Sequence, residues 1–235
     1  MLVLENVHVD LARTPVLRNV SVQFRAGSVV AVVGRNGAGK TTLLRTVMGL
    51  VRLKSGRILF DDDELQDLPA HWRAEQGIGY APEDRVIFPT LTVAENMRLP
   101  CEAHGLSDRD IDDRMALVLE VVPQLRDLMK RSGAALSGGQ GKMVALGRAL
   151  MAGTRLVLLD EPFQGLAPVL ALQYAEALGR LRQVRPDLCV IITESNASLL
   201  KGIPDQTVTL ERGELWSDGP SPAASVNRPS SGVLP

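Results

Sequence analysis

The stretch that decides the fold is "GRNGAGKTT", residues 34–42, which matches the pattern G-x-x-x-x-G-K-[ST]. It follows "SVVAVV", residues 28–33, a β-branched run that predicts a buried strand, and it leads into "TTLLRTVMGLV", residues 41–51, which predicts a helix. Glycines let consecutive backbone N–H groups close around phosphate oxygens, and the helix start adds its positive dipole end. A glycine-rich turn without a ligand is the alternative, but the strand–loop–helix context favours a phosphate-binding loop.

Two side chains of this loop carry specific chemistry. Lys40 adds a positive charge for the β- and γ-phosphates of a nucleotide, and the Thr41 hydroxyl is a ligand that Mg²⁺ accepts. The residues expected to hold the nucleotide are Gly34, Arg35, Asn36, Gly37, Ala38, Gly39, Lys40, Thr41 and Thr42.

A second apolar run, "LVLLDEP" at residues 156–162, ends in two acids. Ligands of open α/β sheets bind at the carboxyl ends of the strands, so both acids should face the phosphate loop. We expect Asp160 to contribute to a Mg²⁺ site and Glu161 to act as a base toward an attacking water. Two solvated acids before a proline turn are the alternative, which the neighbouring phosphate loop makes the weaker one.

The third motif is "LSGGQ", residues 136–140, at the start of a strongly periodic helix. A serine hydroxyl, exposed N–H groups and a helix N-terminus come together at Ser137, Gly138, Gly139 and Gln140, which favours a second anion site. Two phosphate sites about 100 residues apart in one chain suggest one ATP held between two subunits. A helix cap without a ligand is the alternative.

These motifs and their order resemble the nucleotide-binding subunit of ATP-binding cassette (ABC) transporters over roughly residues 2–216. The resemblance implies an α/β P-loop NTPase of ABC type, with a mixed β core, an antiparallel β lobe and a helical insert at about 88–150. It also implies ATP and Mg²⁺ as cofactors, ATP hydrolysis, and a homo- or heterodimer with a second ATPase subunit. Membrane permease subunits, and indirectly a solute-binding protein, would be partners at the cytoplasmic face of the inner membrane.

Two longer stretches resemble one branch of the family. "IGYAPEDRVIFPTLTVAENM", residues 78–97, and "DEPFQGLAP", residues 160–168, are similar to the second ATP-binding subunit of branched-chain amino acid importers and their urea or amide relatives. In that branch the usual glutamine of the Q-loop is often a glutamate, as Glu83 is here. The resemblance therefore implies that Glu83 lies near the metal ion. A regulatory subunit with little turnover and a soluble ABC protein outside transport are the alternatives.

Two positions depart from the family pattern. The loop at residues 10–13, "DLAR", lacks the aromatic that usually stacks on adenine, and Leu11 is its expected replacement. Ser195, in "IITESN" at residues 191–196, takes the place of the usual switch histidine and can offer one uncharged hydrogen bond. Ser195 could equally cap the turn that follows it.

The composition sets outer limits. The 235 residues are 45% hydrophobic with a net charge of −1, so nothing draws the chain to nucleic acid or anionic lipid. The N-terminus does not resemble a signal peptide, no run is long enough to span a membrane, and Cys101 and Cys189 do not predict a disulfide or metal site. Residues 61–64, "DDDE", are expected to form a solvated turn, and residues 217–235, rich in Pro, Ser and Gly, a disordered tail.

Overall fold

The computed structural model describes residues 1–84 and 86–217 and contains two sheets. The smaller, antiparallel sheet has the order β2-β1-β4-β5, and the larger has the order β10-β9-β3-β8-β7-β6 with parallel neighbours from β9 to β6. The strands are β1 (Leu2–Leu11), β2 (Thr14–Phe24), β3 (Val29–Val33), β4 (Ser55–Phe60), β5 (Asp63–Glu64), β6 (Ile78–Ala81), β7 (Leu156–Asp160), β8 (Cys189–Glu194), β9 (Gln206–Glu211) and β10 (Glu214–Ser217).

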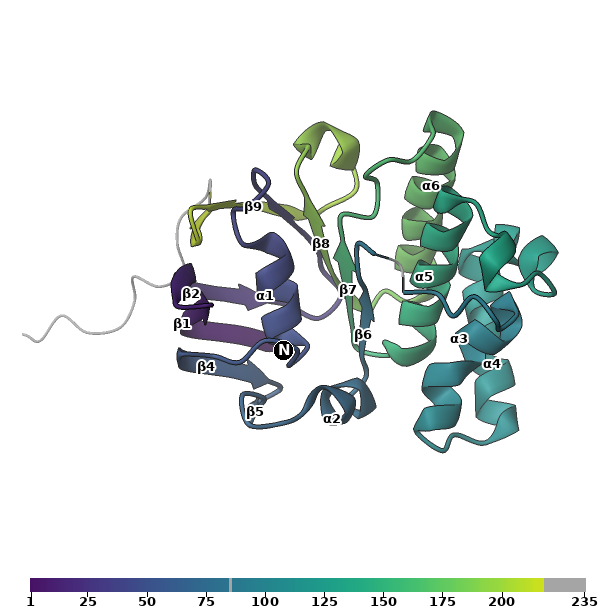
Figure 1. Cartoon of the computed structure of the whole chain (residues 1–235), viewed down its shortest axis with the longest axis horizontal. Helices are drawn as coiled ribbons and strands as arrows, with labels where there is room; N and C mark the ends of the chain where they lie inside the picture. The colour runs from purple at the N-terminus through teal and green to yellow at the C-terminus, as the bar shows by residue number, and fades with distance from the viewer. Residues whose placement is uncertain (85, 218–235) are drawn as a thin grey trace, which may run out of the picture.

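Helices cover both faces of the large sheet. In Figure 1 the small sheet lies at the left, helices α3 to α6 lie at the right, and strands β6 to β8 run between them. The helices are α1 (Lys40–Val47), α2 (Ala70–Glu75), α3 (Val93–Ala103), α4 (Asp108–Val121), α5 (Gly138–Ala152) and α6 (Pro168–Val184), with short 3₁₀ turns at Pro123–Leu128, Gly133–Ala135 and Ala197–Leu200.

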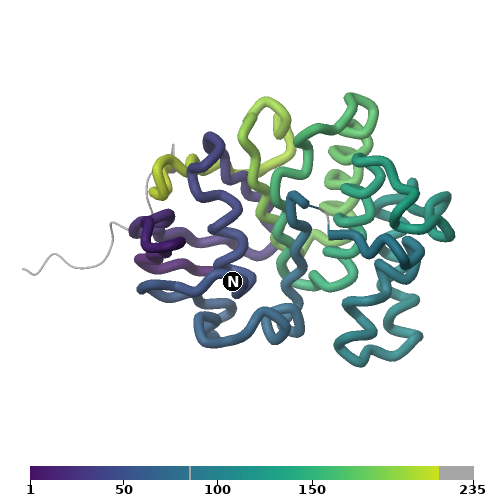
Figure 2. Tube along the Cα trace, viewed as in Figure 1, coloured from purple at the N-terminus to yellow at the C-terminus, as the bar shows by residue number. Residues whose placement is uncertain are grey.

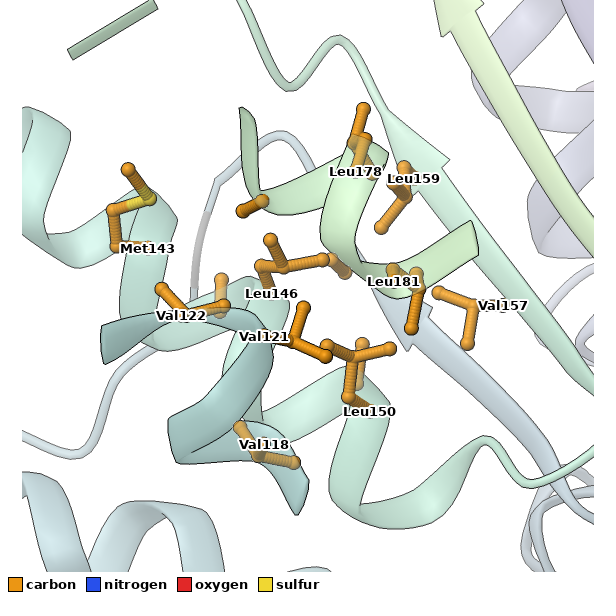
Figure 3. Close-up of a cluster of buried hydrophobic side chains, with 14 of the residues drawn as sticks. Val118, Val121, Val122, Met143, Leu146, Leu150, Val157, Leu159, Leu178 and Leu181 are labelled. Atoms are coloured by element: carbon orange, nitrogen blue, oxygen red, sulfur yellow. The ribbon is translucent and has the colours of Figure 1, made fainter. Parts of the chain in front are cut away.

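The large sheet separates two hydrophobic cores. One core packs α1 between the two sheets, with Leu43 and Leu44 against strand residues of both. The other core fills the opposite face, where α4, α5 and α6 meet β7; the side chains labelled in Figure 3 converge there from these elements. Every residue of β7 is buried because helices cover both of its faces.

The predicted α/β architecture, with its antiparallel β lobe and helical insert, is confirmed. In Figure 2 the helices of the insert lie at the right-hand end of the molecule, in teal to green, and the last of them, α5, continues to Ala152 and packs against β7. Cys101 and Cys189 are buried free thiols. No helix in the described part of the chain is long and apolar enough to cross a membrane.

Four local expectations were wrong or incomplete. The helix after the phosphate loop ends at Val47 rather than Val51, because Gly49 adopts φ +79° and stops it. Asp63–Glu64 is not only a turn but the edge strand β5, paired with β4. Ser217, expected in the tail, ends β10, and residues 218–235 of that predicted tail lie outside the described residues. Helix α2 was missed because it is too short for a periodic signal.

Arg73 of α2 fixes the C-terminal end of α1. Its guanidinium is buried and donates hydrogen bonds to the carbonyl oxygens of Thr46 at 2.9 Å, Val47 at 2.8 Å and Leu68 at 2.8 Å. Burial lowers the pKa of Arg73 to about 10, so the group remains a cation at neutral pH. A cation at a helix C-terminus also interacts favourably with the helix dipole.

We predict that Arg73→Ala lowers the free energy of unfolding by about 3 kcal/mol, because three carbonyls, those of Thr46 and Val47 buried and that of Leu68 partly buried, lose a charged donor. Arg57→Ala is the matched control, since Arg57 is exposed and pairs with Glu5, and it should cost less than about 1 kcal/mol. Urea denaturation measures both variants. Equal losses for the two would show that Arg73 does not hold α1.

Candidate active site

The phosphate loop joins the end of β3 to the start of α1, as predicted. Gly37 and Gly39 adopt φ +81° and +109°, a backbone region that favours glycine. The Lys40 side chain folds back over the loop and donates hydrogen bonds to the carbonyl oxygens of Gly34 at 2.7 Å and Arg35 at 3.2 Å. Lys40 is only 4% exposed, so its ammonium group needs a nearby negative charge.

Glu161 supplies that charge. Its Oε1 lies 3.0 Å from Lys40 Nζ, and the residue is 4% exposed. Glu161 follows directly after β7 and adopts φ +46°, which strains a residue with a side chain. The conformation is held because the Glu161 N–H donates to the Thr193 carbonyl at 3.1 Å and Lys142 Nζ donates to the Glu161 carbonyl at 2.6 Å. The strain aims the carboxylate at the phosphate loop.

Ser195 contacts the other carboxylate oxygen of Glu161. The Ser195 hydroxyl donates to Glu161 Oε2 at 3.0 Å, and the Ser195 N–H approaches the same atom at 3.3 Å. The alternative role as a helix cap falls to Asn196, whose side chain accepts from the Ser198 N–H. Ser195 is therefore joined to the site predicted for it, through Glu161.

Asp160 is the last residue of β7 and is 2% exposed. Three hydroxyl groups surround its carboxylate. Thr41 of α1 and Thr193 of β8 donate to Oδ1 at 3.1 Å and 2.7 Å, and Tyr80 of β6 donates to Oδ2 at 3.2 Å. Thr41 and Asp160, both predicted near a metal, are thus in direct contact.

A pocket of about 310 Å³ opens above these groups. Eight of the predicted residues line it: Asn36, Gly37, Gly39, Lys40, Thr41, Thr42, Glu83 and Glu161. The prediction missed Val16 of β2 and Gln164, which also line it. Gln164 follows the acidic motif by three residues and could have been included on that ground, whereas the approach of Val16 depends on how the two sheets pack.

The remaining predicted residues lie outside that lining. Five of them adjoin the lining residues in the chain or contact them: Gly34, Arg35, Ala38, Asp160 and Ser195. Leu11 ends β1 and is 42% exposed.

Ser137 and Gln140 form a reciprocal cap on α5: the Gln140 N–H donates to Ser137 Oγ at 3.3 Å, and the Ser137 N–H donates to Gln140 Oε1 at 3.0 Å. Ser137 and Gly138 are exposed, and Gly139 packs toward Leu170. One chain therefore does not bring its two predicted phosphate sites together.

Glu194 is a buried acid that the sequence analysis did not single out. It is 1% exposed, and its Oε1 accepts the Phe163 N–H at 2.8 Å, which steadies the turn after Glu161. Burial, the largest cause, and the charge of Glu161 raise the pKa of Glu194 to about 7, against the opposing effects of the Phe163 N–H and of Lys142 and Lys40.

A second hollow, the groove, has a volume of about 490 Å³ and lies between the end of α1, β6 and the helical insert. Its walls are largely apolar with a few charged groups. The lining residues are Arg45, Met48, Leu50, Val51, Ala74, Ile78, Tyr80, Pro82, Asp84, Val86, Pro100, Arg148, Ala149 and Ala152. Leu50 and Val86 are exposed there, and Arg148 donates to the Val86 carbonyl at 2.6 Å.

Comparison with known protein families decides the assignment: residues 17–164 match the family model described as ABC transporter. The chain belongs to the ABC transporter family. It is 37% identical to the high-affinity branched-chain amino acid transport ATP-binding protein BraG of Pseudomonas aeruginosa, over 92% of this chain and 91% of BraG. It is 34% identical to the probable branched-chain amino acid transport ATP-binding protein LivF of Archaeoglobus fulgidus, over 87% and 85% of the two chains.

Another relative works in a different system. The lipopolysaccharide export ATP-binding protein LptB of Escherichia coli is 35% identical, over 87% of this chain and 84% of LptB. Among solved structures, the ABC transporter ATP-binding cassette MJ1267 in its ADP conformation is 25% identical with a TM-score of 0.78, covering 92% and 89% of the two chains. An ATP-binding subunit of an ABC transporter is 26% identical with a TM-score of 0.79, covering 92% and 90%. The chain is accordingly an ATP-binding ABC ATPase, which confirms the resemblance seen in its motifs.

We predict that Glu194→Gln gains stability relative to the wild type as the pH rises from 5 to 8. The folded protein favours the neutral carboxyl, so the wild type binds more protons folded than unfolded between its ordinary pKa near 4.5 and about 7, and its unfolding free energy falls there. Urea denaturation across this range, with the exposed Glu211→Gln as control, measures the difference. A constant offset between Glu194→Gln and the wild type would refute the prediction.

Proposed function

We propose that this chain hydrolyses ATP to energise uptake of branched-chain amino acids, or of a similar small polar solute, through a membrane permease. The observation that carries the catalytic part is the contact of Lys40 with Glu161 in the lining of one pocket, with Ser195 hydrogen-bonded to Glu161 from outside that lining. We also propose that residues 2–216 act as one ABC ATPase domain with its helical insert.

Residues 34–42 would hold the nucleotide phosphates through their backbone N–H groups and Lys40. Lys40 has three donors, and here they point to two carbonyls and to Glu161. Binding of the phosphates therefore requires Lys40 to exchange at least one of these partners. The exchange would release the Glu161 carboxylate at the moment the substrate arrives.

The donor set fits Mg²⁺. Thr41, Asp160 and Glu83 offer only oxygen atoms, which Mg²⁺ prefers, and Thr41 already contacts Asp160. Residues 1–84 and 86–217 contain no group of three or more His, Cys, Asp and Glu side chains that could hold a metal by themselves. Mg²⁺ bound by one or two carboxylates together with nucleotide phosphates is the usual arrangement for phosphoryl transfer. When bound, the ion would neutralise charge on the phosphate oxygens.

Glu161 would act as general base toward the attacking water, because its carboxylate faces the phosphate loop at the end of β7. Ser195 would orient that carboxylate with one uncharged hydrogen bond in place of the usual histidine. The site would accordingly keep Glu161 as its base but have a weaker contact at position 195, where the family usually has the switch histidine. Because of this serine, a subunit that binds ATP with little turnover remains the alternative.

A second ATPase subunit, a copy of this chain or a related one, would complete the site. The N-terminus of α5, with Ser137, Gly138, Gly139 and Gln140, lies outside the pocket of its own chain, and the dipole of a helix N-terminus favours a phosphate. Leu11, exposed at the end of β1, would give apolar contact to the adenine.

The permease would dock in the groove, and the chain would then be a peripheral subunit at the cytoplasmic face of the membrane. Apolar walls with exposed Leu50 and Val86 suit the apolar face of a partner helix.

The likeness to BraG and LivF favours amino acid uptake with a solute-binding protein. The likeness to LptB makes lipopolysaccharide export the second candidate. Copurification of the permease, followed by leucine- or lipid-binding assays, distinguishes the two.

We predict that Glu161→Gln slows ATP turnover by about 10²–10⁴-fold, the usual contribution of a general base. Ser195→Ala should slow it by no more than about ten-fold, since it removes one neutral hydrogen bond worth about 0.5–1.5 kcal/mol. Steady-state phosphate release, measured with the copurified permease, compares the two variants. A Ser195→Ala protein as inactive as Glu161→Gln would make Ser195 catalytic in its own right.

A further inference from the structure

Asp160 is held by more than the phosphate loop. Its Oδ1 accepts the hydroxyls of Thr41 and Thr193, while its Oδ2 has Tyr80 as the hydroxyl donor. Tyr80 pairs with Leu158 in the register of β6 and β7, so its side chain points to the same sheet face as Asp160, two residues further on. That face is the one covered by α1.

Arg45 of α1 is a neighbour of Tyr80. It lies four residues after Thr41 on α1, which brings both side chains to one face of the helix. The Tyr80 hydroxyl is the main cause of the raised pKa of Arg45, so the two side chains are neighbours. One helix thus contacts Asp160 directly through Thr41 and places the Arg45 charge beside Tyr80.

The donor role of Tyr80 is stable. The residue is half-buried, and its hydroxyl, which has one proton to donate, lies 3.2 Å from Asp160 Oδ2. Tyr80 and Arg45 also line the groove, so this row of contacts runs from the groove wall to Asp160.

We propose that Tyr80 is a positioning residue for the metal carboxylate: its hydroxyl fixes the orientation of Asp160 and thereby sets the affinity of the site for a divalent cation. The inference rests on the proposed place of Asp160 in the metal site. Groups that orient a metal ligand typically change metal affinity by about 10–100-fold when they are lost. Tyr80→Phe removes only the hydroxyl and keeps the ring that packs beside α1.

The test is Mn²⁺ binding, followed by electron paramagnetic resonance, to the protein loaded with one equivalent of ADP. Tyr80→Phe should weaken Mn²⁺ binding by about ten-fold while leaving ADP affinity in EDTA unchanged. Tyr174→Phe is the matched control, because Tyr174 is a buried tyrosine of α6 that packs edge-on against Phe163, and it should bind Mn²⁺ like the wild type. Arg45→Gln should give a smaller loss in the same direction.

Asp160→Asn separates the two possible failures. If Asp160→Asn loses Mn²⁺ binding and Tyr80→Phe does not, the role of Tyr80 is refuted and the metal assignment stands. If Asp160→Asn binds Mn²⁺ like the wild type, the metal assignment fails and the inference fails with it. If Tyr80→Phe loses ADP affinity in EDTA as strongly as it loses Mn²⁺, the hydroxyl supports the fold rather than the metal site, and the inference is refuted.

Discussion

The ion pair of Lys40 and Glu161 joins the two elements on which the site depends. Lys40 begins α1 and Glu161 follows β7, and both side chains are almost fully removed from water. Neither charge could be buried alone without a penalty of several kcal/mol, so each stabilises the position of the other. The strained backbone at Glu161 is tolerated because Thr193 and Lys142 hold its N–H and carbonyl, while Ser195 holds its carboxylate. The arrangement that we propose for catalysis is thus present in the folded chain, with Lys40 paired to Glu161, and a bound phosphate would take the place of that carboxylate.

The meeting of the phosphate loop with Asp160 and Glu161, and the long helices, were predictable from local sequence. Residues 34–42, Asp160 and Glu161 each sit at the end of a buried strand, and strand ends converge at one edge of a parallel sheet, so spacing alone places them together. The long helices were predictable from their periodicity, because they cover the sheet with one apolar face.

What the sequence could not supply is contact between distant elements. Val16 reaches the pocket through the packing of one sheet against another, and Tyr80 reaches Asp160 through the register of β6 on β7. Glu194 appeared as one more polar residue after an apolar run, and only its burial distinguishes it from a solvated acid. The departures at Leu11 and Ser195 were visible, but their consequences depend on partners that a single chain does not contain.

We propose that each chain supplies one half of each of two ATP sites, with Ser137 contributing to the pocket of a second subunit. The most direct measurement is sedimentation of the Glu161→Gln protein with and without Mg-ATP, alone and mixed with the second ATPase subunit of its transporter. The account predicts that ATP converts monomer to dimer in at least one of these mixtures, and that adding Ser137→Glu abolishes the dimer by placing a negative charge against the phosphates. The same monomer fraction with and without Mg-ATP in both mixtures would contradict it.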